Sequence, residues 1–507
     1  MSRPRQETFI ARRLFLLLIL VASILAGAIY LLAYRGANAG THREIQPLNG
    51  ALDSIAALPL VNVGTDPDTE YLSDAVTEGI IRSLSHIPSL KVIARASVLR
   101  YKGRDVDPKT VGRELAVNSV LTGRLIQRGD NLSINLELVD ARDNSHLWGE
   151  QYNRRVTELL SVQQEIARAI SERLRPRLTS GEQQHVASSH TENAEAHQLY
   201  LRGSYFLERN DEASIQRARE YFQQAIEKDP NYALAYTGLA ATYLDRADEA
   251  KAQEAKAAVM KALEIDNSLG EAHISLADIL WHREWNFAKA EPEFRRGIEL
   301  NPGHAGAHHQ YSHYLMTLGR VEESLAESNR SLELDPLSPA ANVHMGWYYL
   351  MVRQYDQAIE WEQKALAMDT NFRNARFQLG EAYYYKGMYD QAVEEYLKVE
   401  VLSGARPQLM TSLREAYKRS GIRGFVKKWL NEEKQSEERL NPYIPRTQLI
   451  AKLYGRLGAK ERATEWLERA VEKRDLFVDG FRTEPEFDNL RSDARFVVLL
   501  QRIGLPQ

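Results

Sequence analysis

The sequence has no cysteine among its 507 residues, which excludes disulfides, thiol nucleophiles and cysteine zinc sites. Neither sign of charge dominates, because 65 basic residues stand against 69 acidic ones and the formal net charge is −4. Without an excess of positive charge the surface does not attract nucleic acid, so we expect no DNA or RNA partner. The apolar share of 44% and the charged share of 26% are typical of a folded chain.

Catalytic motifs are also missing. The sequence contains no glycine-rich phosphate loop, no dinucleotide-binding glycine pattern, no nucleophile elbow and no kinase catalytic loop. Acidic, serine and histidine side chains are plentiful, but without such a pattern each is best interpreted as a solvated surface group. We therefore expect a protein that is not an enzyme and that needs no cofactor. An enzyme with an unrecognised site in an α/β domain remains an alternative.

One long hydrophobic run is present. Residues 14–34 read LFLLLILVASILAGAIYLLAY, 21 residues without a charge. At 1.5 Å per residue, a helix of this length crosses a hydrocarbon core of about 30 Å. Four arginines precede the run, and only two follow it closely: Arg3, Arg5, Arg12 and Arg13 before it, Arg35 and Arg43 after it. Because basic residues favour the cytoplasmic side, this bias keeps the amino terminus in the cytoplasm.

This pattern predicts a single-pass protein of the inner (plasma) membrane. Residues 1–13 form a cytoplasmic stub, residues 35–51 form a linker, and the bulk of the chain lies on the periplasmic or extracytoplasmic side. The alternative is a signal peptide that is cleaved after Ala39, because Ala37-Asn38-Ala39 has the small-x-small form of such sites. Against it, the apolar run exceeds the roughly 7–15 residues of a signal core.

Residues 52–178 predict a small α/β domain with a mixed sheet. Apolar runs and alternating segments indicate strands, and apolar residues at helical spacing indicate amphipathic helices. A Gly-containing tight turn at 128–131 joins two alternating segments as a hairpin. We expect strands at 54–63, 90–94, 119–127, 132–140 and 146–152, and helices at 66–87, 110–116 and 156–174.

Two blocks of this segment carry a family resemblance. SIAALPLVNVGTDPDTEYLSDAVTEGIIRSLSHIPSLKVIARASVLRYKG and VLTGRLIQRGDNLSINLELVDARDNSHLWGEQYN resemble the TolB amino-terminal-like (FlgO-like) domain, which stands ahead of tetratricopeptide repeats in bacterial proteins. Relatives often join this domain to a protein kinase, a winged-helix DNA-binding domain or an adenylate cyclase, and none of these precedes it here. Leu60, Ala75 and Gly79 depart from the family pattern, so a ligand site of relatives at that loop and helix is not expected in this chain.

Three residues of these blocks have separate interpretations. Trp148 on a predicted strand is expected in the core. For Arg95 and Lys102, the hypothesis is an anion-binding role.

An internal repeat fills most of the remaining chain. Corresponding turns at 229, 266, 301, 335, 369 and 403 are separated by 37, 35, 34, 34 and 34 residues. A small residue, a large one four later and a small one three after that precede these turns, as in Ala218, Phe222 and Ala225. This pattern is that of tetratricopeptide repeats, pairs of helices that stack into a superhelical all-α solenoid. We expect a linker at 179–192, seven to eight units over 193–475, and a capping segment at 476–507.

The concave face of such a solenoid is the expected binding site for a partner protein or peptide. Adding 34 to a residue number identifies its stacked neighbour, and the predicted groove residues form three ladders: His309, Val343 and Phe377; His313, Trp347 and Glu381; Met316, Leu350 and Tyr384. The favoured function is a membrane-anchored scaffold or sensor. The alternative is a regulatory module that is linked to a kinase, an adenylate cyclase or transcription and acts with a separate output protein.

The spacing of four histidines raises the question of a metal motif. His304 and His308, and likewise His309 and His313, stand four residues apart, which brings two imidazoles together on one helix face. No zinc-protease glutamate accompanies them and no cysteine completes a site. The sequence therefore favours packing or groove histidines and predicts no metal site.

Overall fold

The computed structural model describes residues 52–64, 70–174, 191–209, 211–243, 249–404, 407–435, 445–474 and 481–505. They belong to one compact unit, Leu52–Gln507. The transmembrane segment predicted at 14–34, with its stub and linker, lies outside the described residues. Within the described ranges, no helix combines the length and the apolar composition needed to cross a membrane.

The amino-terminal part is built on a mixed sheet, as expected. β1 (Ser54–Ala57) runs parallel to both of its neighbours, β3 (Lys91–Val92) and β4 (Ser119–Arg128). β4, β5 (Asn131–Asp140) and β6 (His146–Arg155) form an antiparallel meander, and the order is β3-β1-β4-β5-β6. At the predicted hairpin Arg128 pairs with Asn131, and Gly129 has a φ of 59°, the left-handed conformation that two-residue hairpin turns favour.

The first predicted strand is interrupted. Pro59 has no N–H to donate, so the expected strand at 54–63 divides into β1 and the short β2 (Val61–Asn62), which pairs with β4. α4 (Pro108–Leu115) follows the prediction, whereas α3 (Arg95–Leu99) was not predicted. The 3₁₀ turn η2 (Val156–Glu158) precedes α5 (Leu159–Leu174).

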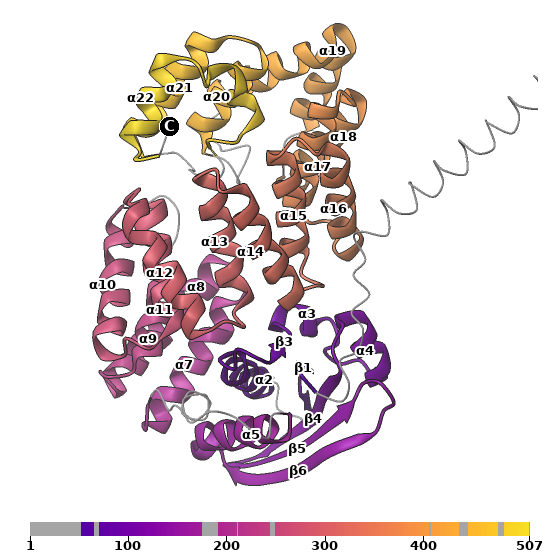
Figure 1. The fold of residues 1–507 in the computed structure, drawn as a ribbon, viewed down its shortest axis with the longest axis vertical. Helices are drawn as coiled ribbons and strands as arrows, with labels where there is room; N and C mark the ends of the chain where they lie inside the picture. The colour runs from indigo at the N-terminus through magenta and orange to yellow at the C-terminus, as the bar shows by residue number, and fades with distance from the viewer. Residues whose placement is uncertain are drawn as a thin grey trace, which may run out of the picture. The chain divides into compact units, whose positions relative to one another are not determined.

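Helices cover one face of this sheet. α2 (Glu70–Ser85) and α5 lie between the sheet and the repeat helices (Figure 1). On β5 the side chains alternate accordingly, because the buried Ile134 and Leu136 flank the exposed Asn135. A sheet with one polar face is typical of antiparallel meanders.

Among the described residues, six helix pairs follow in register. Each second helix packs on its own first helix and on the first helix of the next pair. The pairs are α7 (Ala194–Leu207) and α8 (Glu212–Lys228); α9 (Ala233–Ala241) and α10 (Glu249–Ile265); α11 (Gly270–His282) and α12 (Phe287–Leu300); α13 (Ala305–Thr317) and α14 (Val321–Leu334); α15 (Pro339–Met351) and α16 (Tyr355–Met368); α17 (Arg373–Lys386) and α18 (Tyr389–Leu402).

Two less regular units follow. α19 (Pro407–Gln435) is broken at Ser420 and Gly421, whose backbone is not helical. α20 (Arg446–Arg456) and α21 (Lys460–Glu472) form the last pair, and η3 (Pro485–Leu490) and α22 (Ala494–Arg502) pack against it.

The large residue of the repeat pattern packs against glycines of the two flanking helices. Phe222 on α8 is fully buried, and a Cβ built on Gly203 or on Gly238 would lie 2.7 Å or 2.5 Å from its ring. Glycine on α7 and α9 therefore admits the ring between neighbouring units, which is the packing role that the repeat pattern predicts.

The α/β part shares one hydrophobic core with the first repeats and with residues of the carboxyl-terminal segment, while the later repeats have smaller clusters of their own. Backbone and side-chain hydrogen bonds tie the α/β part to the turns that end two repeats. Ala94 N donates to Leu334 O at 2.8 Å, Ser97 Oγ donates to Asp335 Oδ1 at 2.6 Å, and Gly303 N donates to Ser85 O at 3.0 Å. The repeat array is therefore docked on the α/β part.

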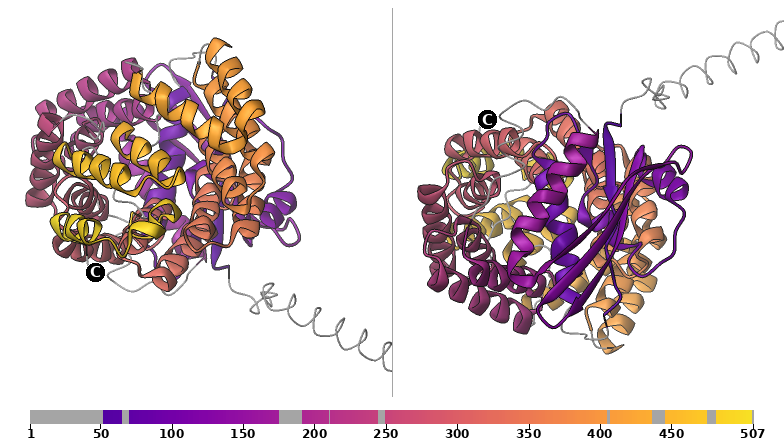
Figure 2. Two further views of the ribbon diagram at one scale, coloured as in Figure 1. Left: turned by 90° about the horizontal axis from the view of Figure 1, so that it is seen from above. Right: turned by 90° about the horizontal axis from the view of Figure 1, so that it is seen from below.

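The carboxyl-terminal segment returns to earlier repeats. Arg482 Nη1 donates to Leu318 O at 3.1 Å, and Arg353 donates to Thr483 O and pairs with Asp488. Viewed from above, α20–α22 lie beside the middle repeats (Figure 2). The segment predicted as an end cap thus also contacts the ends of α13 and α15.

Candidate functional site

The predicted groove is largely filled. Six of its nine residues are at most 8% exposed: Met316, Val343, Trp347, Leu350, Phe377 and Glu381. His309, His313 and Tyr384 are half-buried. The expectation of an open apolar groove at these positions therefore needs correction, because adjacent first helices pack against one another and the carboxyl-terminal segment adds a further layer.

An arginine of the chain occupies one end of the predicted groove. Arg456 ends α20 and hydrogen-bonds to the Glu381 carboxylate on α17, 75 residues earlier in the chain. Its guanidinium lies 4.4 Å from the centroid of the Tyr384 ring, and Nη1 is 3.2 Å from the Tyr396 hydroxyl. The predicted groove residues Glu381 and Tyr384 thus form a carboxylate-and-aromatic site that holds a helix-borne cation.

This contact belongs to a buried cluster of two cations and three carboxyls. Lys452 Nζ is 3.2 Å from Glu484 and 3.4 Å from Glu486, and Arg456 is 2.8 Å from Glu486. Burial raises the pKa of Glu381 and raises that of Glu484 to about 7. Burial acts on Glu486 too, but Lys452 and Arg456 outweigh it and hold the pKa of that carboxyl well below its usual range. The cluster is electrically balanced when one carboxyl keeps its proton.

The histidines of the predicted motif separate into two roles. His304 Nδ1 accepts a hydrogen bond from Ala307 N at 2.8 Å and caps α13, while His308 bonds to Glu327 and to Pro302 O. His309 and His313 instead lie against His344 of α15, with ring centroids 4.5 Å and 4.2 Å away.

Trp347 completes this group. Its ring stacks on His313 with a centroid distance of 4.3 Å, which is the neighbour relation that the 34-residue register predicts. His344 was not among the predicted site residues. The residue 34 positions before His344 is Gln310, so the 34-residue register does not identify His344 as a neighbour of His309 or His313.

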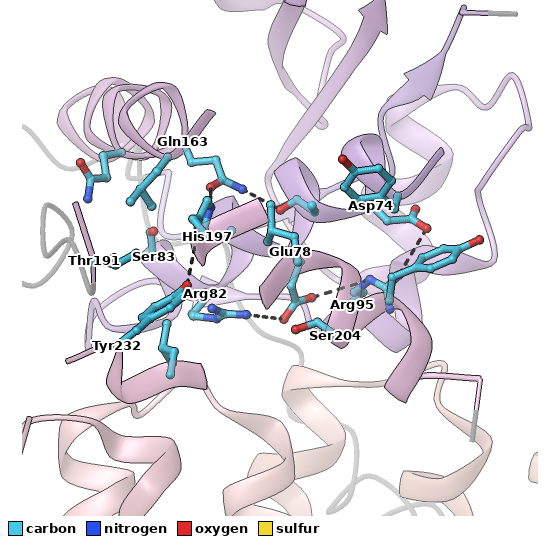
Figure 3. A pocket seen from close by; sticks show the side chains of 18 of the residues that line it. Asp74, Glu78, Arg82, Ser83, Arg95, Gln163, Thr191, His197, Ser204 and Tyr232 are labelled. Atoms are coloured by element: carbon cyan, nitrogen blue, oxygen red, sulfur yellow. Dashed lines mark hydrogen bonds and ion pairs between the residues drawn. The ribbon is translucent and has the colours of Figure 1, made fainter. Parts of the chain in front are cut away.

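A second candidate site lies between the α/β part and the first repeats. Residues of α2, α5 and α7 line a cavity of about 70 Å³ (Figure 3). A hydrogen-bond chain crosses it: Gln163 donates to Ala75 O at 2.8 Å and accepts from His197 Nε2 at 3.2 Å, and His197 Nδ1 accepts from the Tyr232 hydroxyl at 3.0 Å. Pockets for organic ligands occupy about 300–1,000 Å³, so this cavity has room for a few waters.

Gly79, which departs from the pattern of the TolB-like family, lines the same cavity. A Cβ on Gly79 would lie 2.4 Å from Gln163 Nε2, so glycine makes room for the amide that reaches α2. Glycine at position 79 therefore permits the contact between α2 and α5.

The two cations proposed to bind an anion are already paired. Arg95 lies near Asp74 and Glu78 and forms an ion pair with Glu208. Lys102 pairs with Glu70 at 2.7 Å and with Asp74 at 2.8 Å. Four carboxylates therefore surround two cations, and the site repels an added anion, which corrects the hypothesis. Trp148 on β6 is half-buried and packs against the core.

Comparisons with protein families agree with the repeat assignment. Residues 221–254 and 374–400 match models described as tetratricopeptide repeat. The chain therefore carries tetratricopeptide repeats, as its period predicted, and such repeats mediate protein–protein interaction. Residues 51–169 match the model described as HilA/YgeH-like transcriptional regulator, second domain. This description differs from the TolB amino-terminal-like family expected from the sequence, which this match does not show.

One curated relative is a protein of Rhizobium meliloti (strain 1021) named "Putative adenylate cyclase 3". It is 36% identical over 197 residues, which are 39% of this chain and 34% of that protein. The match thus spans about a third of the relative's length.

Two solved structures resemble the chain at low identity. PilF of Pseudomonas aeruginosa is 22% identical, with a TM-score of 0.35, over 46% of this chain and 98% of that one. A thermophilic tetratricopeptide repeat protein of Thermus thermophilus is 18% identical, with a TM-score of 0.33, over 37% of this chain and 99% of that one.

Proposed function

We propose that this chain is a membrane-anchored scaffold or sensor that binds a partner protein through its repeat array and acts by binding, without catalysis. The contact of Arg456 with Glu381 and Tyr384 carries the proposal, because it indicates what the concave side of the array can hold. A helix that presents an arginine to a buried carboxylate and an aromatic ring uses contacts that recur in peptide recognition.

Part of the predicted groove surface remains accessible. His309, His313 and Tyr384 keep part of their side chains exposed beside residues that are buried. We propose that a partner segment binds over these side chains, either next to the carboxyl-terminal segment or in its place. Aromatic side chains at such positions contribute strongly to binding.

A photocrosslinker tests this surface. With p-benzoylphenylalanine in place of Tyr384 in the full chain, in native membranes, we expect one discrete crosslinked protein, identified by mass spectrometry, at several times the yield seen from Met260. Met260 is the matched control, since it is 51% exposed and lies on α10, a second helix. Equal crosslinking from both positions would contradict a concave partner site.

A second candidate function has its own support. The matched family model describes a transcriptional regulator, and the Rhizobium meliloti relative carries the name of an adenylate cyclase. Together with the resemblance to the TolB-like domain of bacterial proteins, this supports a regulatory module that signals to a separate kinase, cyclase or transcription protein. The two candidates differ in the compartment where the repeats act.

Topology is therefore a decisive measurement. We propose that residues 14–34 anchor the chain in a bacterial inner membrane with its repeats in the periplasm. A carboxyl-terminal alkaline phosphatase fusion is then expected to be active and a green fluorescent protein fusion dark, because the phosphatase folds only after export. The opposite result would place the repeats in the cytoplasm and favour the regulatory candidate. A phosphatase fused after residue 13 is the inactive control.

A further inference from the structure

A polar pocket interrupts the apolar core of the repeats. Phe222, Phe294 and Tyr396 fill the gap between successive units, but in α14 the equivalent residue, 34 after Phe294, is Ser328. The His344 ring from α15 occupies the space that this small side chain leaves, and it is only 3% exposed. A buried imidazole in a repeat core needs polar partners.

Two serines determine which nitrogen of His344 carries the proton. Ser312 Oγ donates to His309 O at 2.6 Å, and Ser328 Oγ donates to Ser324 O at 2.7 Å, so each hydroxyl has used its one hydrogen. Both oxygens also lie near His344 Nε2, at 2.6 Å and 2.9 Å, where they can only accept. His344 therefore carries its proton on Nε2 and has a lone pair on Nδ1.

This Nδ1 lone pair is buried, and in the described part of the chain it has no hydrogen-bond partner. In metal-ligating histidines, a hydrogen bond from the ring nitrogen that faces away from the metal usually fixes the tautomer in this way.

Two more imidazoles lie beside the His344 ring. Ligand nitrogens of His309, His313 and His344 lie within 4.8 Å of one another. Three nitrogens on a tetrahedral zinc ion are about 3.3 Å apart. The rings of His309 and His313 must therefore turn toward His344, and both are half-buried, so they can turn and they leave an entry path from solvent.

We propose that His309, His313 and His344 form a binding site for a divalent first-row transition metal ion, zinc foremost, with a fourth position open to water or to a donor atom of a partner. Three imidazoles without a carboxylate select zinc, copper or nickel over calcium or magnesium. The ion would link α13 to α15 and so join two neighbouring repeats. This reverses the expectation of no metal site, because the third ligand comes from another unit.

Metal binding to the full chain in detergent, without a polyhistidine tag, tests the proposal. Zinc affinity is measured by competition with a chromophoric chelator, and Co²⁺ absorption reports the coordination geometry. We expect one ion per chain, a tetrahedral cobalt spectrum, and at least a tenfold loss of affinity in His309→Ala and in His313→Ala. His146→Ala is the control, since His146 is exposed on β6, and it should bind zinc as the parent does.

Unfolding does not confound this comparison, because both ligands chosen for replacement are half-buried and circular dichroism melts establish that each variant is folded. A rise of the melting temperature on adding zinc to the parent, absent in His313→Ala, would support the site further. Zinc binding that is unchanged in His309→Ala and His313→Ala, or less than one-fifth of an equivalent retained by the parent after dialysis, would overturn the proposal. The result does not depend on whether a partner protein binds.

Discussion

Replacing Arg456 with alanine is expected to destabilise the folded unit by about 3–5 kcal/mol, because it leaves a buried carboxylate without its cation. The Arg456 side chain and the Glu381 and Glu486 carboxylates that it contacts are each at most 3% exposed. Lys452 remains to balance Glu486, but Glu381 loses the guanidinium bond. The measurement is the shift in the midpoint of urea unfolding, followed by circular dichroism.

Arg462→Ala is the matched control for this prediction. Arg462 lies on the next helix, α21, and pairs with Glu465 while its side chain is 64% exposed, so its removal should have no measurable effect. Arg456→Lys retains the charge but has one terminal nitrogen, whereas Arg456 uses Nη2 for the two carboxylates and Nη1 for the Tyr396 hydroxyl. We therefore expect an intermediate loss of stability. If Arg456→Ala and Arg462→Ala unfold at the same urea concentration, the buried cluster does not hold the carboxyl-terminal segment on α17.

Glu400→Gln is expected to stabilise the protein at alkaline pH. Glu400 on α18 is 5% exposed, and burial together with the nearby Glu433 raises the pKa of Glu400 to about 8. In the unfolded chain a glutamate has a pKa near 4.3. The folded state therefore binds this proton more tightly, and its stabilising effect is complete below about pH 4.3 and is lost as the pH rises toward 8.

Each pH unit between those values removes up to about 1.4 kcal/mol of stability. Allowing for relaxation of the site, we expect Glu400→Gln to exceed the parent by about 2–4 kcal/mol at pH 8 and to equal it near pH 4.5. Urea midpoints at the two pH values provide the measurement. Glu394→Gln is the control on the same helix, since Glu394 is 54% exposed and solvated in both states. A Glu400→Gln difference that does not vary with pH would contradict the raised pKa.

Local patterns predicted much of the architecture. The repeat period, the burial of Phe222 between units and the hairpin at Gly129 depend on residues that are close in the chain or one full unit apart, so they leave a visible pattern. The five-residue helix α3 was missed because it is too short to show a helical period.

The candidate sites were predicted less well. Stacking of His313 on Trp347 followed from the register, but the burial of Phe377 and Glu381 did not. His344 joins the histidine pair because Ser328 replaces a large residue in the preceding unit, and nothing in the spacing of His309 and His313 indicates this. The pairing of Arg95 with Glu208 likewise depends on the docking of α7 beside α2.

By itself the sequence determined that a mixed-sheet part precedes stacked helix pairs, and which residues of neighbouring pairs meet, because those contacts repeat at a fixed separation. Only the tertiary structure decided that α20 and the segment after it lie against α13, α15 and α17, and hence that an arginine fills the predicted groove. Small rotations accumulate from one repeat to the next. Their sum brings distant units together, and the repeat period in the sequence does not predict which distant units meet.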